Sequence, residues 1–187
     1  MNNLNVLNVE KRRKAGHYEI LGETYAKLEF FENGWNPYSR FLDIDKVDLI
    51  VRRRDSKKSV YKEIQVKYGK LYECTSKWEK ALFDVTSWRF FKESEFDEFV
   101  DDPNFFIAYV LSDEKSYKGD IFIFPARAFS NLLHSAIRSK DKVKVYISRL
   151  CGSNDWVLRK VHNFSTIDNN TTINVSQFHR NFKLLLG

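Results

Sequence analysis

The segment VDLIV (residues 47–51) is followed, after a charged stretch, by VYKEIQVKY (residues 60–68). Apolar and polar residues alternate through much of the second segment, which is the pattern of a strand with one face buried and the other solvated. The two segments lie close together in the chain, so they are predicted to pair as a β-hairpin. Side chains two positions apart share a face of a strand, so Gln65 and Lys67 are expected to point to the same side.

A helix is predicted on each side of this hairpin. The first begins near Gly16 and ends at Glu32, before the stop signal Asn33-Gly34. Its inward face is expected to carry four residues at helical spacing: Leu21, Tyr25, Leu28 and Phe31. The second helix is predicted over residues 76–91.

The C-terminal half is predicted to contain further strands and helices. The run FFIAYVL (residues 105–111) is apolar throughout, which is typical of a strand covered on both faces in an α/β sheet. Helices are expected after Pro125, because its missing N–H costs nothing at a helix start, and after Ser176, which is expected to be an N-cap. Three more strands are predicted, over residues 121–124, 143–150 and 156–161.

The composition is that of a folded globular chain. Of 187 residues, 43% are hydrophobic and 16% are aromatic, which excludes intrinsic disorder. No apolar run approaches the roughly 20 residues of a membrane span, and two cysteines are too few for a disulfide scaffold. No signal peptide is expected, so the protein is predicted to be cytoplasmic. The fold class predicted is α/β, a mixed central β-sheet flanked by helices in a single domain over residues 16–187, preceded by a loosely ordered basic arm at residues 1–15.

The net charge is compatible with a polyanionic partner but does not require one. Lysine and arginine exceed aspartate and glutamate by six, and an acidic stretch over residues 93–102 opposes the basic clusters, so one basic face and one acidic edge are expected. Each charged run could equally be a solvated loop. The residues predicted to contact DNA are Arg52, Arg53, Arg54, Lys70 and Trp78, with burial as the alternative for the tryptophan. A further set, inferred from charge alone, is Lys142, Lys144, Arg149, Arg159, Lys160 and Arg180.

The hairpin also carries residues suited to chemistry. If its strands pair, Asp48 can lie beside Gln65 and Lys67, which assembles a carboxylate, a second oxygen ligand and an ammonium group. Magnesium takes hard oxygen ligands and keeps several waters. A bound metal lowers the pKa of an attacking water and offsets charge on a phosphoryl oxygen. These residues are therefore a minimal set for phosphodiester hydrolysis.

This arrangement resembles the PD-(D/E)XK nuclease superfamily, which includes restriction endonucleases, Holliday-junction resolvases and some homing endonucleases. Asp48 matches the aspartate before an apolar strand, and Gln65-Val66-Lys67 matches the second half of the motif in its glutamine variant. A glutamate on the first helix often completes the site in this family, and Glu23 is similarly placed.

The resemblance implies a restriction-endonuclease-like fold and a Mg²⁺ ion, for which Mn²⁺ would substitute. It implies that Asp48, Gln65, the backbone carbonyl of Val66 and Glu23 hold the metal, while Lys67 acts on the attacking water.

The sequence departs from the family pattern at two positions. Val47 stands where the family has proline, and the neutral Gln65 stands in place of a carboxylate, so metal affinity should depend more on Glu23 and on substrate phosphate. Two nearby acids, Glu63 and Asp45, could stand in for the assigned ligands.

Each assignment has a structural alternative. Asp48 could cap a strand end, and Gln65 and Lys67 could form the solvated face of a half-exposed strand. Glu23 could pair with Lys27 at the i,i+4 spacing.

The function indicated is a metal-dependent DNA endonuclease that leaves a 5′-phosphate, as the resemblance implies. Double-strand cleavage would require a homodimer or two encounters, because one site cuts one strand. Two alternatives are a catalytically inactive nucleic-acid-binding or assembly module with the same fold and a protein-interaction domain. No Gly-rich phosphate loop or zinc-ligand spacing occurs, so no nucleotide cofactor is expected.

Overall fold

A fifteen-residue strand, β3 (Ser59–Glu73), lies at the centre of the molecule. The computed structural model describes residues 3–39, 46–54, 58–113 and 116–187. Three α-helices are described: α1 (Asn3–Glu32), α2 (Lys77–Leu82) and α3 (Ala126–Ser135). Short 3₁₀ turns are η1 (Asp97–Phe99), η2 (Ser176–Phe178) and η3 (Phe182–Leu186). The other strands are β1 (Asn36–Ser39), β2 (Leu49–Arg54), β4 (Phe83–Phe91), β5 (Phe105–Ser112), β6 (Asp120–Pro125), β7 (Ile137–Ser139), β8 (Lys142–Leu150), β9 (Trp156–Arg159) and β10 (Thr172–Asn174).

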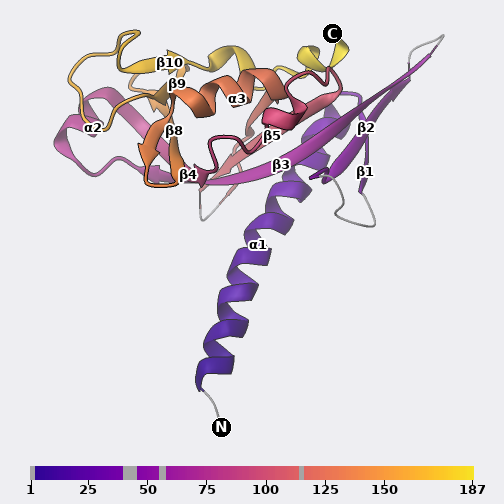
Figure 1. Ribbon diagram of the computed structural model, residues 1–187, viewed down its shortest axis with the longest axis horizontal. Helices are drawn as coiled ribbons and strands as arrows, with labels where there is room; N and C mark the ends of the chain where they lie inside the picture. The colour runs from indigo at the N-terminus through magenta and orange to yellow at the C-terminus, as the bar shows by residue number, and fades with distance from the viewer. Residues whose placement is uncertain (1–2, 40–45, 55–57, 114–115) are drawn as a thin grey trace.

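The described strands form one mixed sheet that branches at β3 (Figure 1). On one side, β1, β2 and β3 pair in antiparallel order, β5 runs parallel to β3, and β6 pairs antiparallel with β5. The far end of β3 pairs with β4, from which β8, β9 and β10 continue, and β7 pairs with β8. The predicted mixed α/β class and the predicted hairpin at residues 47–68 are confirmed.

The core lies on both faces of β5. All eight residues of this strand are buried, as predicted for a strand in the middle of the sheet. One hydrophobic cluster packs under α3 around Phe129, and the other packs under α1 around Phe30. In the part of the chain that the structure describes, no helix is both long and apolar enough to cross a bilayer.

The first helix differs from its prediction in length and in orientation. It begins at Asn3 rather than near Gly16, so the predicted loose arm is helical from that residue. Leu28 and Phe31, expected to face inward, are 56% and 67% exposed, whereas Ala26 and Phe30 are fully buried.

The reason for the different helix face is a buried polar contact. Glu29 is 5% exposed and lies on the inward side of α1. Its Oε1 accepts hydrogen bonds from Arg180 Nη1 at 2.9 Å and from the Tyr117 hydroxyl at 2.9 Å. Burial and the neighbouring Glu29 raise the pKa of Tyr117 well above its usual range. A hydropathy pattern scores a glutamate as outward, so it could not find this face.

The helix predicted over residues 76–91 is wrong beyond Leu82. Only Lys77–Leu82 is helical, and residues 83–91 form strand β4. The segment FDVTSWRFF is rich in aromatic and β-branched residues, which fit a pleated surface better than a helix. The final helix predicted from Ser176 is also wrong, because that region contains only the 3₁₀ turns η2 and η3.

A third, smaller core cluster lies beneath α2 and includes Phe83 and Trp78. The guanidinium of Arg159 is enclosed there, with a side chain that is 2% exposed. It lies 4.4 Å from the ring centroid of Phe83 and 2.7 Å from Glu79 Oε1. Burial alone would raise the pKa of the Glu79 carboxyl, but hydrogen bonds from Arg159 and Ser76 outweigh it and hold the pKa below its ordinary value.

We predict that Glu79→Gln lowers the free energy of unfolding by about 2 kcal/mol near neutral pH, because it removes the charged acceptor of Arg159. The folded-state pKa of Glu79 lies below the ordinary value of 4.5. Its contribution is therefore complete above that value and is lost as the pH falls through the lower folded-state value. Urea unfolding of both proteins across this range measures the difference, which should shrink in acid.

The control is Glu73→Gln at the exposed end of β3, which should stay within about 0.5 kcal/mol of wild type. A stability difference for Glu79→Gln that is the same at every pH would contradict the ion-pair explanation.

Candidate active site

The candidate site lies where β3 has only one partner strand. Ile64 is the last residue of β3 paired with β2, and Leu71 is the first paired with β4. Between them, among the described strands, β3 pairs only with β5. A gap in a sheet exposes backbone groups that side chains or ligands must satisfy.

Asp48 fills part of this gap from its position directly before β2. Its backbone N–H donates to the Ile64 carbonyl at 3.0 Å, and its Oδ2 accepts the backbone N–H of Val66 at 2.6 Å. Further along the same gap, Arg89 Nη1 donates to the carbonyl of Tyr68 at 2.8 Å. The strand-capping alternative for Asp48 is therefore realised in the structure, and it fixes the carboxylate against the backbone of β3.

A cavity of about 270 Å³ opens beside this carboxylate, and we name it the Asp48 cavity. Its lining includes all five positions that the sequence singled out as one site: Glu23, Asp48, Gln65, Val66 and Lys67. The remaining lining residues are Tyr18, Glu19, Gly22, Tyr68 and Arg89. The structure thus places the predicted site residues from α1, β2 and β3 around one volume.

Gly22 explains how α1 comes near enough to contribute Glu23. A Cβ built on Gly22 would lie 3.1 Å from Tyr68 Cβ and 3.6 Å from Val66 Cγ1, so a larger residue would push the helix off β3. Glu23 forms the predicted ion pair with Lys27, at 3.4 Å, and both side chains are about one-third exposed.

Sequence reasoning missed Glu19. It lies one helical turn before Glu23 and lines the same cavity. The i,i+4 spacing of the two glutamates was the available signal, because residues at that spacing share a helix face.

Gln65 carries the clearest sign of an unmet interaction. The residue is 9% exposed, and its Oε1 is buried with no hydrogen-bond partner in the described part of the protein. Leaving a buried acceptor unsatisfied costs about 1–3 kcal/mol. A cation or a water molecule in the adjoining cavity would supply the missing partner.

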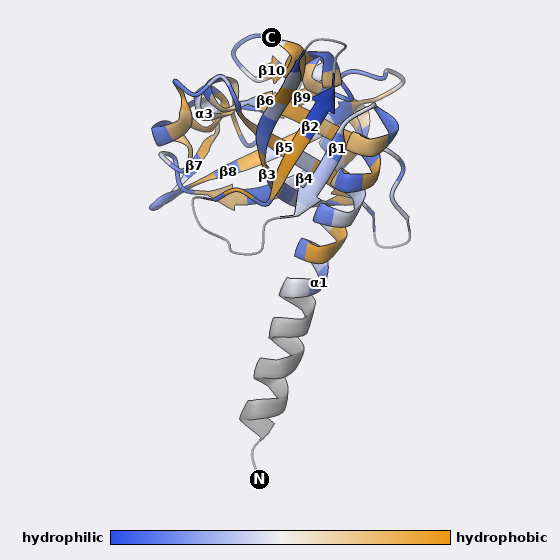
Figure 2. Cartoon of the chain, turned by 90° about the vertical axis from the view of Figure 1, so that its right-hand side faces the viewer, coloured by the Kyte–Doolittle hydropathy of each residue, from blue (hydrophilic) through white to orange (hydrophobic). Residues whose placement is uncertain are grey.

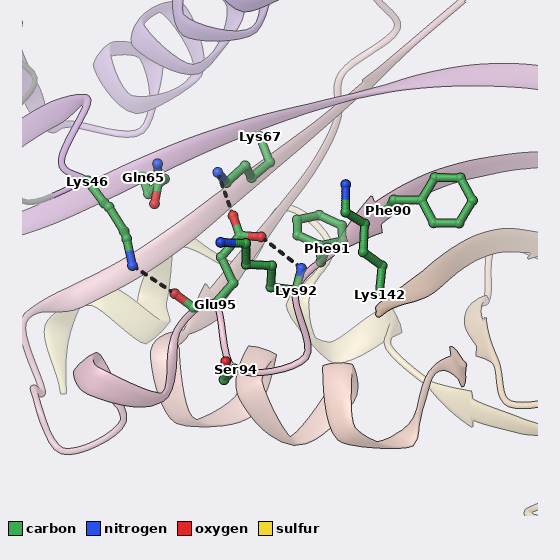
Figure 3. A pocket seen from close by; sticks show the side chains of 9 residues that line it. All are labelled: Lys46, Gln65, Lys67, Phe90, Phe91, Lys92, Ser94, Glu95 and Lys142. Atoms are coloured by element: carbon green, nitrogen blue, oxygen red, sulfur yellow. Dashed lines mark hydrogen bonds and ion pairs between the residues drawn. The ribbon is translucent and has the colours of Figure 1, made fainter. Parts of the chain in front are cut away.

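Lys67 is held by an acidic residue from another part of the chain. Its Nζ lies 3.0 Å from Glu95 Oε1, and the lysine side chain is only 13% exposed (Figure 3). Glu95 is fixed in turn, because its Oε2 accepts the backbone N–H of Lys92 at 3.3 Å and its carbonyl accepts from Lys46 Nζ at 3.2 Å. The sequence placed Glu95 on an acidic edge and gave no sign of this pairing across 28 positions.

A second cavity, of about 540 Å³, adjoins the first through Gln65 and Lys67, and we name it the lysine cavity. It is lined by Lys46, Gln65, Lys67, Phe90, Phe91, Lys92, Ser94, Glu95 and Lys142 (Figure 3). Four lysines and a single carboxylate give this cavity a net positive charge, which suits a phosphate group.

The oxygen donors in the Asp48 cavity are compatible with Mg²⁺. In the described residues, no three His, Cys, Asp or Glu side chains gather into a group that could hold a metal. Magnesium, however, is usually bound through one or two carboxylates together with waters and substrate phosphates. Asp48 and Glu23 are carboxylates of that kind, the unpartnered Gln65 Oε1 is a neutral oxygen, and the Val66 carbonyl points to the same strand edge as its N–H.

Of the two alternative acids, Glu63 lies outside this arrangement. Glu63 is paired in register with Ile50 and lines neither the Asp48 cavity nor the lysine cavity. Asp45 lies outside the described residues.

The predicted arginine cluster lies away from the cavities. Arg52, Arg53 and Arg54 occupy the other end of β2, the blue arrow in Figure 2, about 13–20 Å along the strand from Asp48. Arg52 donates to Ser59 Oγ from Nε at 3.2 Å and from Nη2 at 3.0 Å.

Other predicted DNA contacts are partly revised. Trp78 packs with its ring centroid 5.4 Å from that of Phe164 and 6.4 Å from that of Phe83, so the structure favours the packing alternative. Arg159 is buried, which makes its prediction as a surface contact wrong.

Gly22 and Gly16 form a matched pair that tests how closely α1 approaches β3. A Cβ on Gly16 meets no atom within 4 Å. We predict that Gly16→Ala raises the melting temperature, since alanine is favoured over glycine in a helix by about 1 kcal/mol. Gly22→Val should lower stability by about 1–3 kcal/mol, because its side chain overpacks against Tyr68 and Val66. Thermal unfolding by circular dichroism measures both, and a Gly22→Val protein as stable as wild type would rule out the close contact.

Comparison with protein-family models, curated proteins and solved structures returned no match to this chain. The function of the site is therefore argued from its own residues.

Proposed function

We propose that this protein is a metal-dependent DNA endonuclease of the PD-(D/E)XK type, with a restriction-endonuclease-like fold. The observation that carries the proposal is the Asp48 cavity, where the Asp48 carboxylate, the unpartnered amide oxygen of Gln65 and Lys67 line a single volume. The contribution of α1 to the same cavity supports the proposal, because the resemblance called for a glutamate from the first helix.

In this proposal, Asp48, Gln65, the Val66 carbonyl and Glu23 hold Mg²⁺, for which Mn²⁺ substitutes. The metal would supply an activated water and offset charge on the phosphate. Lys67 would orient the attacking water and stabilise the negative charge that develops on a phosphate oxygen. To do so its ammonium exchanges Glu95 for the phosphate, and the lysine cavity offers that phosphate a positive site beside it.

The decisive test is cleavage of supercoiled plasmid and branched DNA with Mg²⁺, Mn²⁺ or EDTA. We predict metal-dependent nicking by wild type and its loss in Lys67→Ala, by a factor of about 100 or more, because a preorganised charge at the phosphate is removed. DNA binding should be retained. Lys183→Ala removes the same charge from the exposed side of η3 and should cut normally.

Cleavage by Lys67→Ala at the wild-type rate would overturn the assignment of this residue. Two observations favour a second candidate, a catalytically inactive binding module with the same fold. Lys67 is neutralised by Glu95, and the neutral Gln65 stands where the family has a carboxylate. That candidate predicts DNA binding indifferent to Mg²⁺ and no cleavage of any substrate.

Arg52, Arg53 and Arg54 remain the proposed contacts to distant phosphates. Replacing all three with glutamate should weaken DNA binding and flatten its dependence on salt. A plot of log K against log salt concentration has a negative slope, and each lost contact to a duplex phosphate reduces the magnitude of that slope by about 0.9. Fluorescence anisotropy at several salt concentrations measures the slope, and an unchanged slope would remove this end of the hairpin from the footprint.

We also propose a homodimer, because one site cuts one strand and paired cleavage needs two. The exposed apolar side chains of Leu28 and Phe31 on α1, with Tyr38 on β1, give such a dimer a surface to bury.

A further inference from the structure

A row of aromatic side chains lies exposed on the sheet beside the lysine cavity. Tyr72, Trp88 and Phe90 are 38%, 39% and 43% exposed, high values for large apolar side chains within strands. Tyr146 on β8 stands directly opposite Trp88 in the strand register, and Lys144 stands opposite Phe90. Opposed residues share a face of the sheet, so these five residues form one surface, which we name the platform.

The contacts within the platform hold its rings in place. The rings of Tyr72 and Trp88 are nearly parallel, at 16° with centroids 6.3 Å apart, and Phe90 meets Trp88 edge-on at 5.8 Å. Lys144 Nζ lies 4.1 Å from the Trp88 centroid and 4.6 Å from that of Tyr146. The ammonium group thus stands over aromatic faces, where it is attracted by the ring quadrupoles.

The amount of protein that covers this face of the sheet changes along the length of the strands. Toward α2, Phe83 and the guanidinium of Arg159 are covered by Trp78 and Phe164 and form the third core cluster. Over Trp88 and Phe90 no described segment provides such a cover, whereas the Tyr146 ring meets the His162 ring edge-on at 6.5 Å. Tyr72, Trp88 and Phe90 therefore each keep more than a third of their surface open to a ligand, beside the Lys144 ammonium group.

The platform continues into the candidate site. Phe90 belongs to the platform and also lines the lysine cavity (Figure 3). Lys142 on β8 lines the same cavity. Lys67 and Gln65 line the far side of that cavity. At the other end, Lys70 Nζ lies 5.2 Å from the ring of Tyr72. Cationic groups thus flank the rings from one end of the platform to the other.

We propose that the platform binds single-stranded DNA, with bases stacked on Trp88 and its neighbours and phosphates contacted by Lys70, Lys142 and Lys144. Exposed aromatic rings interleaved with cations are the features by which proteins hold unpaired strands, since every base has a π-face. A duplex hides those faces. An apolar protein partner would have to bury the Lys144 charge without an acid to compensate it.

A strand held on the platform would enter the lysine cavity at Phe90 and Lys142 and bring a phosphate to Lys67. This part rests on the proposed nuclease function and names its substrate class as DNA with unpaired bases, such as an overhang, a flap or a displaced strand. Binding to the platform itself does not depend on cleavage.

The test is fluorescence anisotropy with a labelled oligo-dT of about 20 nucleotides and a duplex of the same length, both in EDTA so that cleavage cannot occur. Wild type is expected to bind the single strand more tightly than the duplex. Trp88→Ala should weaken single-strand binding at least about fivefold, the smallest effect expected for one stacked base. Leu186→Ala removes an exposed apolar side chain from η3, outside the platform and the cavities, and should bind like wild type.

Two further variants keep the test valid should Trp88→Ala be poorly folded. Lys144→Gln should lower the salt slope by about 0.7, the value for one phosphate contact on a single strand. In Trp88→Phe, binding should persist while the quenching of tryptophan emission by oligo-dT is lost, because Trp35 and Trp156 are buried and Trp78 packs against Phe83 and Phe164.

Equal affinity for duplex and single strand, or unchanged single-strand binding in Trp88→Ala and Lys144→Gln, would overturn the platform. Either result would leave plasmid nicking unaffected, so the nuclease proposal could survive it. Conversely, Trp88-dependent binding in a protein that cuts no substrate would reject the nuclease alone.

Discussion

The hydrogen bond from the Val66 N–H to the Asp48 carboxylate determines how the rest of the site is arranged. The β2–β3 ladder ends at Leu49 and Ile64, so Val66 would otherwise present an unpaired backbone donor. One carboxylate oxygen satisfies that donor and fixes Asp48 at the edge where the cavity opens. The structural and chemical interpretations of Asp48 are therefore not exclusive. A substitution of Asp48 would change both the hairpin and the site, which makes Lys67 the cleaner probe of chemistry.

Local sequence patterns were sufficient for the hairpin, β5 and α3, because each of these elements has a distinct periodicity or a clear start signal. They were sufficient also for the grouping of Asp48, Gln65 and Lys67, since strand alternation and hairpin pairing place these residues together without help from the rest of the fold. Residues 83–91 were misassigned because an apolar, aromatic segment after a helix start satisfies helical and strand patterns alike. Short strands such as β1, β7 and β10 carry too few residues to show a period.

What could not be predicted depends on contacts between distant parts of the chain. Glu95 reaches Lys67 only through the turn after β4, and its own neighbours suggest nothing but an acidic surface. The platform arises in the same way, because Trp88 and Tyr146 become neighbours only through the pairing of β4 with β8. The inward face of α1 is set by a glutamate whose partner lies 151 positions away.

The contact between Glu29 and Arg180 relates the order in which the chain is synthesised to the order in which its elements pack together. Glu29 is buried against Arg180, and a buried carboxylate without its partner is strongly unfavourable. While the chain is being made, α1 is synthesised before Arg180 and lacks, until residue 180 has been added, the cation that stabilises its docked position. The contact of Gly22 and Glu23 with β3 is therefore less stable before that point. The α1 side of the cavity is therefore stabilised late, and a nascent chain can form the β2–β3 hairpin before it has a finished site.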